Sequence, residues 1–190
     1  MNKTTSQEPV TALNHDEVFD YWRCLISASP VKLDMAHVDA HGDFSGLIDT
    51  HVFVYLQQVL LAYPADERLD QIDHNRSRLT LANYMSFAVA CRWIERIEYV
   101  THPQWRPEDP FNHFFRNNDP STGFLELRHT NRRNTVIATE PAVSYKFTPA
   151  TAFAQTGFAH AFLSQSPNYT PSTADKLIPI FHEYIDFGVT

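Results

Sequence analysis

The sequence predicts an α/β fold, with a mostly parallel sheet and helices on both faces of that sheet. Segments with the apolar pattern of strands alternate with segments of helical period, an order typical of parallel sheets with helical crossovers. At 190 residues and 43% hydrophobic content, the chain can bury one substantial core and fits one domain better than two. We expect a flexible tail over residues 1–12 and a single domain over residues 13–190.

The first half of the chain is predicted to form three helices and two strands. Apolar residues recur at helical spacing after Asn14 and Asp16, either of which can cap a helix. The two strands are short apolar runs, one of which begins at a proline while the other ends at one. In order, we expect a helix over residues 14–28, a strand over 30–41, helices over 47–63 and 79–97, and a strand over 97–103.

The second half changes character, because prolines and aromatic residues interrupt the segment from 104 to 134. We expect this segment to be an excursion at the edge of the sheet. Three further strands are expected within residues 124–130, 134–147 and 159–167. A helix over 172–187 is expected to follow, with Pro179 bending or interrupting it.

Charge and apolar runs restrict the classes of function. A formal net charge of -7 argues against a surface for nucleic acid or anionic membranes, because phosphate binding shows as an excess of Lys and Arg. A cationic ligand suits this charge better. The sequence has no secretory signal and no run of the roughly 18 apolar residues that a membrane helix needs, so we expect a cytoplasmic location. Cys24 and Cys91 lie in apolar segments and are expected to be buried free thiols.

The stretch "MAHVDAHGDF", residues 35–44, places metal-binding side chain types at every second position. Alternate residues of a strand face one side, so Asp39, His41 and Asp43 begin on a common side. A straight strand would put Asp39 and Asp43 roughly 13 Å apart, whereas the ligands of one metal each lie about 2.0–2.2 Å from it. The backbone must therefore turn after Asp39, and Gly42 offers the conformational freedom for that turn.

The side chain types also indicate which metal would fit. Aspartate and histidine without a thiolate suit manganese, iron or zinc better than a soft ion, and open α/β sheets bind ligands at the carboxyl ends of their strands. His15, at the start of the helix that leads into this strand, strengthens the metal interpretation, while His37 is expected to be a hydrogen-bonded core histidine. The alternative is that these polar residues only cap helices or bond to loop backbone.

The stretches "NHDE" at 14–17 and "VDAHGDF" at 38–44 resemble the ureohydrolase family of arginases and agmatinases. With "ANYMSFAVACRWIERIEYV" and "SQSPNYTPSTADKL", the chain from about residue 13 onward is more similar to the small peptide arginases of ribosomal peptide biosynthesis. This resemblance implies a compact arginase-like three-layer domain. It also implies conversion of arginine residues in a precursor peptide to ornithine, with release of urea.

Carried over residue by residue, the resemblance implies that one or two manganese ions are held by His15, Asp39, His41 and Asp43. It further implies that Asp43 is catalytic as well as a ligand. Arginases supply two more ligands from a Ser-x-Asp-x-Asp motif, but this chain has no Asp between Asp119 and Asp175. The second carboxylate pair of the family is therefore missing from the sequence.

Glu140 is a candidate to compensate for the missing pair. As a catalytic residue it would replace one ligand or hold the substrate guanidinium, and the alternative is a surface acid in a loop. Glu126 and His160 are weaker candidates. Two other functions stay open at this point: a metal-dependent amide hydrolase or deacetylase, and a non-catalytic binding domain stabilised by metal.

Overall fold

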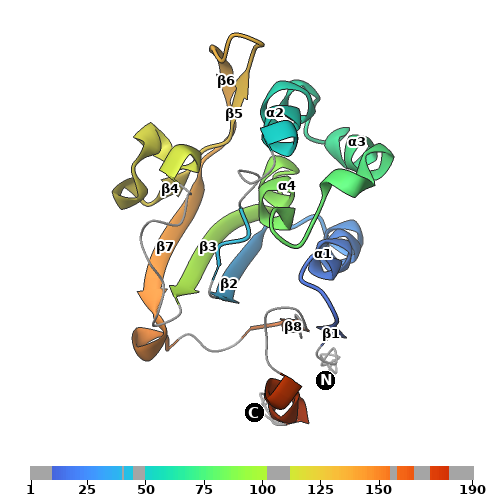
Figure 1. Cartoon of the computed structure of the whole chain (residues 1–190), viewed down its shortest axis with the longest axis vertical. Helices are drawn as coiled ribbons and strands as arrows, with labels where there is room; N and C mark the ends of the chain where they lie inside the picture. The colour runs from blue at the N-terminus through green and yellow to red at the C-terminus, as the bar shows by residue number, and fades with distance from the viewer. Residues whose placement is uncertain are drawn as a thin grey trace.

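The computed structural model describes residues 10–39, 41–44, 50–101, 112–154, 158–164 and 172–179. Its central sheet has four strands in the order β2 (Leu33–Asp39), β3 (Ile94–Thr101), β7 (Val143–Pro149) and β4 (Phe124–Leu125). The first three strands run parallel and β4 runs antiparallel to β7 (Figure 1). The chain is therefore α/β with a mixed, mostly parallel sheet, as the sequence predicts.

Among the described residues, four α-helices accompany this sheet. In Figure 1 they gather on the β2 side of the sheet, while β4 lies at the opposite edge beside β7. They are α1 (Glu17–Ala28), α2 (Thr50–Gln58), α3 (Arg68–His74) and α4 (Tyr84–Ala90). The 3-10 turns are η1 (Leu60–Ala62), η2 (Arg76–Arg78), η3 (Asn112–Phe114), η4 (Arg116–Asn118), η5 (Pro120–Thr122), η6 (Ala150–Ala152) and η7 (Ser172–Leu177).

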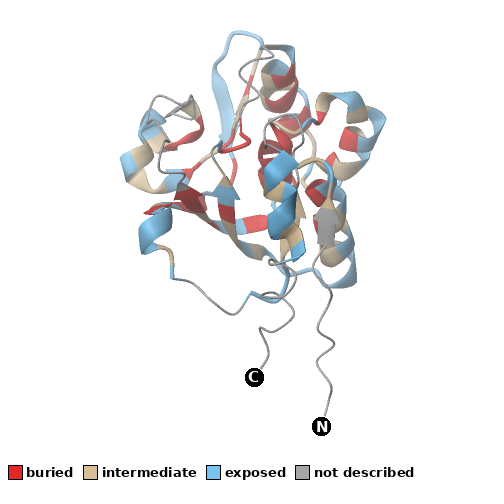
Figure 2. Cartoon of the chain, turned by 60° about the horizontal axis from the view of Figure 1, so that its bottom comes forward, coloured by how far each residue is buried: buried red, intermediate tan, exposed pale blue. Residues whose placement is uncertain are grey.

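One face of the parallel strands packs into the core. His37, Tyr99 and Phe147 are cross-strand neighbours on this face. The His37 ring stacks on Tyr99 at 5.6 Å between ring centroids. On the helical side of the core, Phe19 of α1 contacts Trp93. The buried residues, red in Figure 2, therefore concentrate between the helices and this face of the sheet.

The other face of the sheet is polar. Asp34 and Arg96 are exposed and lie 3.6 Å apart as an ion pair, and Lys146 donates to Glu98. Ile94 and Val100 of β3 and Thr148 of β7 are exceptions because they are buried. The expectation of helices on both faces is thus not met within the described residues, where this face carries exposed charged side chains.

The predicted helix over 79–97 proves wrong in its second half. Helix α4 ends at Ala90, and the segment that follows it becomes β3. Trp93 N–H donates to the Ala88 carbonyl and Arg92 N–H to the Val89 carbonyl, the two bonds of a Schellman motif. Arg92 occupies the left-handed position of this motif, with φ 58°. Because glycine usually fills that position, the sequence carries no sign that the helix ends there.

Several other elements match their predictions in part. The helix expected over 14–28 is α1, and the one over 47–63 becomes α2 followed by η1. The edge excursion is confirmed to the extent that β4, after the turns η3 to η5, is the edge strand of the sheet. Helix α3 has no predicted counterpart. The closing helix is described only to residue 179 and begins as the 3-10 turn η7.

Two small sheets stand outside the central one. β1 (Val10–Ala12) pairs in parallel with β8 (Phe162–Ser164), so three residues of the expected tail belong to a strand. Residues 1–9 lie outside the described part of the chain. β5 (Arg128–Thr130) and β6 (Val136–Thr139) form an antiparallel hairpin, of which β6 is exposed throughout (Figure 2).

Two further sequence expectations concern cysteines and membrane helices. Cys91 is buried, as expected, but Cys24 is exposed because α1 turns it away from the face that buries Val18 and Trp22. Among the described residues, no helix has the length and apolar character needed to cross a membrane.

Candidate metal centre

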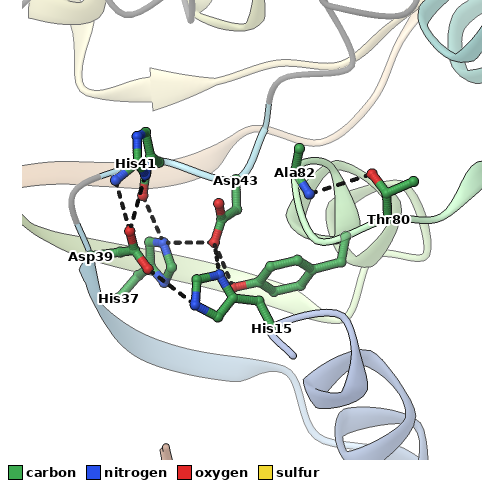
Figure 3. A network of polar contacts seen from close by, with 8 residues as sticks. His15, His37, Asp39, His41, Asp43, Thr80 and Ala82 are labelled. Atoms are coloured by element: carbon green, nitrogen blue, oxygen red, sulfur yellow. Dashed lines mark hydrogen bonds and ion pairs between the residues drawn. The ribbon is translucent and has the colours of Figure 1, made fainter. Parts of the chain in front are cut away.

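The cluster forms where β2 ends and where α1 begins. Asp39 is the last residue of β2, and Asp43 follows it after a turn. His15 lies two residues before the first residue of α1. Its carbonyl accepts from the Val18 N–H, and the Glu17 carboxylate accepts from the Asn14 N–H, which fixes the backbone on both sides of His15. Figure 3 shows His15, Asp39 and Asp43 pointing toward one another.

The spacing within this cluster is close to that of ligands around one metal ion. His15 Nε2 lies 3.6 Å from Asp39 Oδ2, and His15 Nδ1 lies 3.4 Å from Asp43 Oδ2. One ligand atom from each residue can be chosen so that all three lie within 4.8 Å of one another. Ligands about 2.1 Å from a common ion are separated by about 3.4–4.2 Å, between tetrahedral and opposed positions. One imidazole and two carboxylates are also a suitable donor set for a borderline or hard divalent cation.

The turn that brings Asp43 back toward β2 uses the side chain of Asp39 and the backbone of Asp43. Asp39 Oδ1 accepts from the His41 N–H at 2.8 Å, which is an Asx turn. Asp43 itself has φ 52°, in the left-handed region that aspartate tolerates better than most residues. The turn was expected to rely on Gly42, but the residue with positive φ is Asp43.

Asp43 is held by two residues that the sequence did not identify as part of the site. Tyr84, the first residue of α4, donates its hydroxyl to Asp43 Oδ2 at 3.0 Å. His37 Nε2 lies 3.5 Å from the same oxygen and 3.1 Å from the His41 carbonyl oxygen. The sequence does indicate that His37 lies near the site, because His37 precedes Asp39 by two positions and so lies on the same face of β2. It gives no such indication for Tyr84.

Residues around the start of α4 fix Tyr84 in this place. Asn83 is buried, its Oδ1 accepts from the Thr80 N–H at 2.8 Å, and its Nδ2 donates to the Arg78 carbonyl at 2.9 Å. Ser86 donates its hydroxyl to the Phe44 carbonyl at 3.0 Å. The first turn of α4 therefore binds both Asp43 and the residue after it.

The charges of the cluster favour a cation. Burial alone would lower the pKa of His15, but Asp43, Asp39 and Asp16 together raise that pKa above its ordinary value of 6.5. Burial, with Asp43 adding to it, raises the pKa of Tyr84 well above 10.0. The Tyr84 hydroxyl therefore keeps its proton at neutral pH and acts as a donor. A divalent cation would meet the same two carboxylates that draw a proton to His15.

The cluster is partly exposed to solvent. The side chain of His41 is 65% exposed, that of Asp39 is 18% exposed and that of Asp43 is 5% exposed. His41 Nδ1 lies 3.6 Å from Asp39 Oδ1, but His41 is not among the three residues whose ligand atoms converge.

The structure does not bring Glu140 to this cluster. Glu140 lies three residues before the amino end of β7, whereas the cluster lies at the carboxyl end of the parallel strand β2. Both its oxygens accept from Arg68, at 2.7 and 2.9 Å, and Arg92 donates to one of them at 2.7 Å. Arg68 is only 2% exposed. The carboxylate expected to be catalytic is instead the acceptor of a buried ion pair.

The two weaker candidates also bond elsewhere. Glu126 accepts from Arg116 Nε at 2.6 Å, and His160 Nδ1 lies 3.1 Å from the hydroxyl of Tyr21 on α1. Within the described residues, no second group of three histidines, cysteines or acidic residues converges as His15, Asp39 and Asp43 do.

Comparison of the chain with protein-family models, with curated proteins and with solved structures found no match.

Proposed function

We propose that this protein is a metal-dependent hydrolase that converts arginine residues of a precursor peptide to ornithine and releases urea. The observation that carries the proposal is the convergence of His15, Asp39 and Asp43 at the carboxyl end of β2. The resemblance of the sequence motifs to ureohydrolases is the basis for the proposed reaction and for manganese as the proposed metal. A compact arginase-like domain is part of the same proposal, and the mixed α/β sheet is compatible with it.

His15, Asp39 and Asp43 would hold the ion. When bound, a divalent ion lowers the pKa of a coordinated water and so supplies a nucleophile at neutral pH. The protein contributes position and charge: Tyr84 orients Asp43, and the His41 N–H orients Asp39. The net charge of -7 of the chain favours the approach of a cationic guanidinium.

The partial exposure of the cluster supports a peptide substrate. His41 beside the cluster is 65% exposed, and the side chains of Asp39 and His15 are 18% and 17% exposed. An arginine side chain carried by a peptide could extend toward the cluster from solvent, because its long stem separates the guanidinium from the peptide backbone. The proposed location is the cytoplasm, because precursor peptides are made there.

A non-catalytic metal-binding domain is the second candidate. It is favoured by the missing second carboxylate pair, since the sequence has no Asp between Asp119 and Asp175 and Glu140 is engaged by Arg68 and Arg92. An ion at the cluster would then only tie the start of α1 to the end of β2. A metal-dependent amide hydrolase would use the same three ligands, and only its product would differ.

The test is incubation of the manganese-loaded protein with arginine-containing peptides and, separately, with free arginine. We expect urea and a peptide that has lost the elements of cyanamide at each converted arginine. Asp39→Asn should abolish the product, whereas Asp34→Asn, on the opposite face of the same strand, should retain it. Bound manganese without urea from any arginine peptide would favour the metal-binding domain instead.

A further inference from the structure

The inference concerns how many ions the cluster takes, and it rests on the proposed function. We propose that Tyr84 and His37 are positioning residues that hold Asp43 so that the centre binds a single divalent cation. Tyr84 and His37 both approach Asp43 Oδ2, at 3.0 and 3.5 Å. This is the same oxygen that lies 3.4 Å from His15 Nδ1 and so faces the cluster.

The Tyr84 hydroxyl has a fixed direction. Tyr84 is 4% exposed, begins a helix that is buried along its whole length, and contacts the Trp22 ring at 5.8 Å between centroids. A phenol held in this way donates its single proton to Asp43. One of the lone pairs of Asp43 Oδ2 is therefore already in use before any ion binds.

His37 is a hydrogen-bond donor rather than a ligand. Its Nε2 lies 3.1 Å from the His41 carbonyl oxygen, and a carbonyl oxygen only accepts, so Nε2 carries the hydrogen. A protonated ring nitrogen has no lone pair for a metal. The Nε2–H is directed to the His41 carbonyl, with Asp43 Oδ2 3.5 Å from the same nitrogen, while the ring is held by its stack on Tyr99.

The remaining lone pairs suffice for one ion. Asp39 Oδ1 accepts from the His41 N–H, whereas Oδ2 lies 3.6 Å from His15 Nε2 and faces the cluster. Asp43 Oδ2 has one lone pair beyond that used by Tyr84, and His15 adds one nitrogen. A second ion bridged through Asp43 Oδ2 would need the lone pair that Tyr84 occupies. A second ion bound through Asp43 Oδ1 would need further ligands, and the described residues contain no second converging group of three metal-binding side chains. Three protein ligands on one ion leave positions open for water and substrate.

Calorimetric titration with MnCl₂ tests this inference. The wild-type chain should bind one manganese ion per molecule. Tyr84→Phe should bind one ion with an affinity about 10- to 100-fold lower, because residues that orient a ligand affect metal affinity by that factor. Tyr55→Phe is the matched control, since Tyr55 is also buried and donates its hydroxyl to the Gln71 carbonyl at 3.1 Å, so its affinity should equal that of the wild type.

His37→Gln tests the donor role, because glutamine keeps an N–H donor. The His37→Gln variant should bind manganese with an affinity within a few-fold of the wild type. Complete loss of manganese binding in this variant would identify His37 as a ligand and overturn the inference. Metal-free melting curves of all variants separate altered affinity from unfolding. Two ions per wild-type chain, or wild-type affinity in Tyr84→Phe, would overturn the inference and leave the proposed hydrolase standing. Absence of manganese binding by the wild type would overturn the proposed function itself.

Discussion

His15 and His41 carry the same imidazole ring but meet the cluster through different atoms. His15 presents its ring nitrogens to Asp39 and Asp43, whereas the close contact of His41 is its backbone N–H, 2.8 Å from Asp39 Oδ1. An alanine at position 41 keeps that N–H. At the scale of single residues, the two histidines of the sequence motif are therefore expected to differ in function.

We expect His15→Ala to abolish manganese binding and His41→Ala to reduce its affinity by no more than a few-fold. The 65%-exposed side chain of His41 is screened by solvent, so an ion pair with Asp39 adds little. Equilibrium dialysis of both variants measures this. Equal losses in the two variants would show that the His41 ring is a ligand, as the family motif implies.

Glu140 should be important for stability rather than for catalysis. Arg68 is 2% exposed, and Glu140→Gln would leave its charge without a counter-ion. We expect the free energy of unfolding to fall by about 3 kcal/mol, at the lower end for breaking a buried ion pair because glutamine still accepts a hydrogen bond. Glu126→Gln is the control, since its partner Arg116 is 41% exposed, and should cost about 1 kcal/mol or less. Urea unfolding measures both.

The same ion pair should contribute to acid sensitivity. Burial alone would raise the pKa of Glu140, but hydrogen bonds and charge from Arg68 and Arg92 lower it below its ordinary 4.5. Because this pKa is lower in the folded than in the unfolded chain, the stability it contributes is present above pH 4.5 and is lost as pH falls through the folded value. The difference in unfolding free energy between wild type and Glu140→Gln should therefore shrink with acidification. A difference that stays constant with pH would contradict this assignment.

Helix α4 connects the core to the candidate metal centre. It begins at Tyr84, directly after Asn83, whose side chain makes two hydrogen bonds to the backbone of the preceding turn. At the scale of elements, the position of α4 determines where the Tyr84 hydroxyl lies. A substitution in the turn before α4 should therefore change the metal affinity by moving Tyr84.

Asn83→Ala should lower the free energy of unfolding by about 1–3 kcal/mol, as expected for loss of buried hydrogen bonds, and should also weaken manganese binding. Asn131→Ala is a suitable control, because Asn131 Oδ1 likewise accepts two backbone N–H bonds, from Arg133 and Thr135, in the β5–β6 hairpin. It should affect stability but not affinity. Unchanged manganese affinity in a folded Asn83→Ala protein would refute this coupling through α4.

The boundary between α4 and β3 shows why element boundaries are harder to predict than elements. Apolar residues continue from Tyr84 to Ile97 with no glycine or proline, so the pattern favours one long helix. The helix ends because Arg92 adopts a left-handed conformation, with its side chain donating to Glu140. That partner lies 48 positions away in the sequence. A pattern of neighbouring residues in the sequence cannot predict such a contact.

At the scale of the whole molecule, the sequence predicts strands and short motifs but misses contacts between residues that are far apart in the chain. The parallel strands were predictable from apolar runs bounded by proline or polar residues, and three converging side chains from the two short motifs. Tyr84 lies 41 positions from Asp43, and Arg68 lies 72 positions from Glu140. These partners form only when the sheet and the helices pack. The same contacts decide that Tyr84 belongs to the site and that Glu140 does not.

An ion at the cluster should stabilise the whole fold, because it binds the folded chain and joins the start of α1 to the end of β2. At manganese concentrations about 100 times the dissociation constant, the expected gain is about 2.7 kcal/mol. For a chain of this size, that gain corresponds to a rise in melting temperature of about 5–10 °C. Asp43→Asn should show no rise, whereas Asp34→Asn should behave as the wild type. A similar rise in both variants would indicate binding elsewhere on the acidic surface.

Anomalous diffraction from crystals soaked in MnCl₂ tests the central claim most directly, because it locates the ion without reference to activity. We expect one manganese peak, bounded by the side chains of His15, Asp39 and Asp43, which is lost in crystals of Asp43→Asn. An ion held by other residues, with no peak at this cluster, would contradict the account.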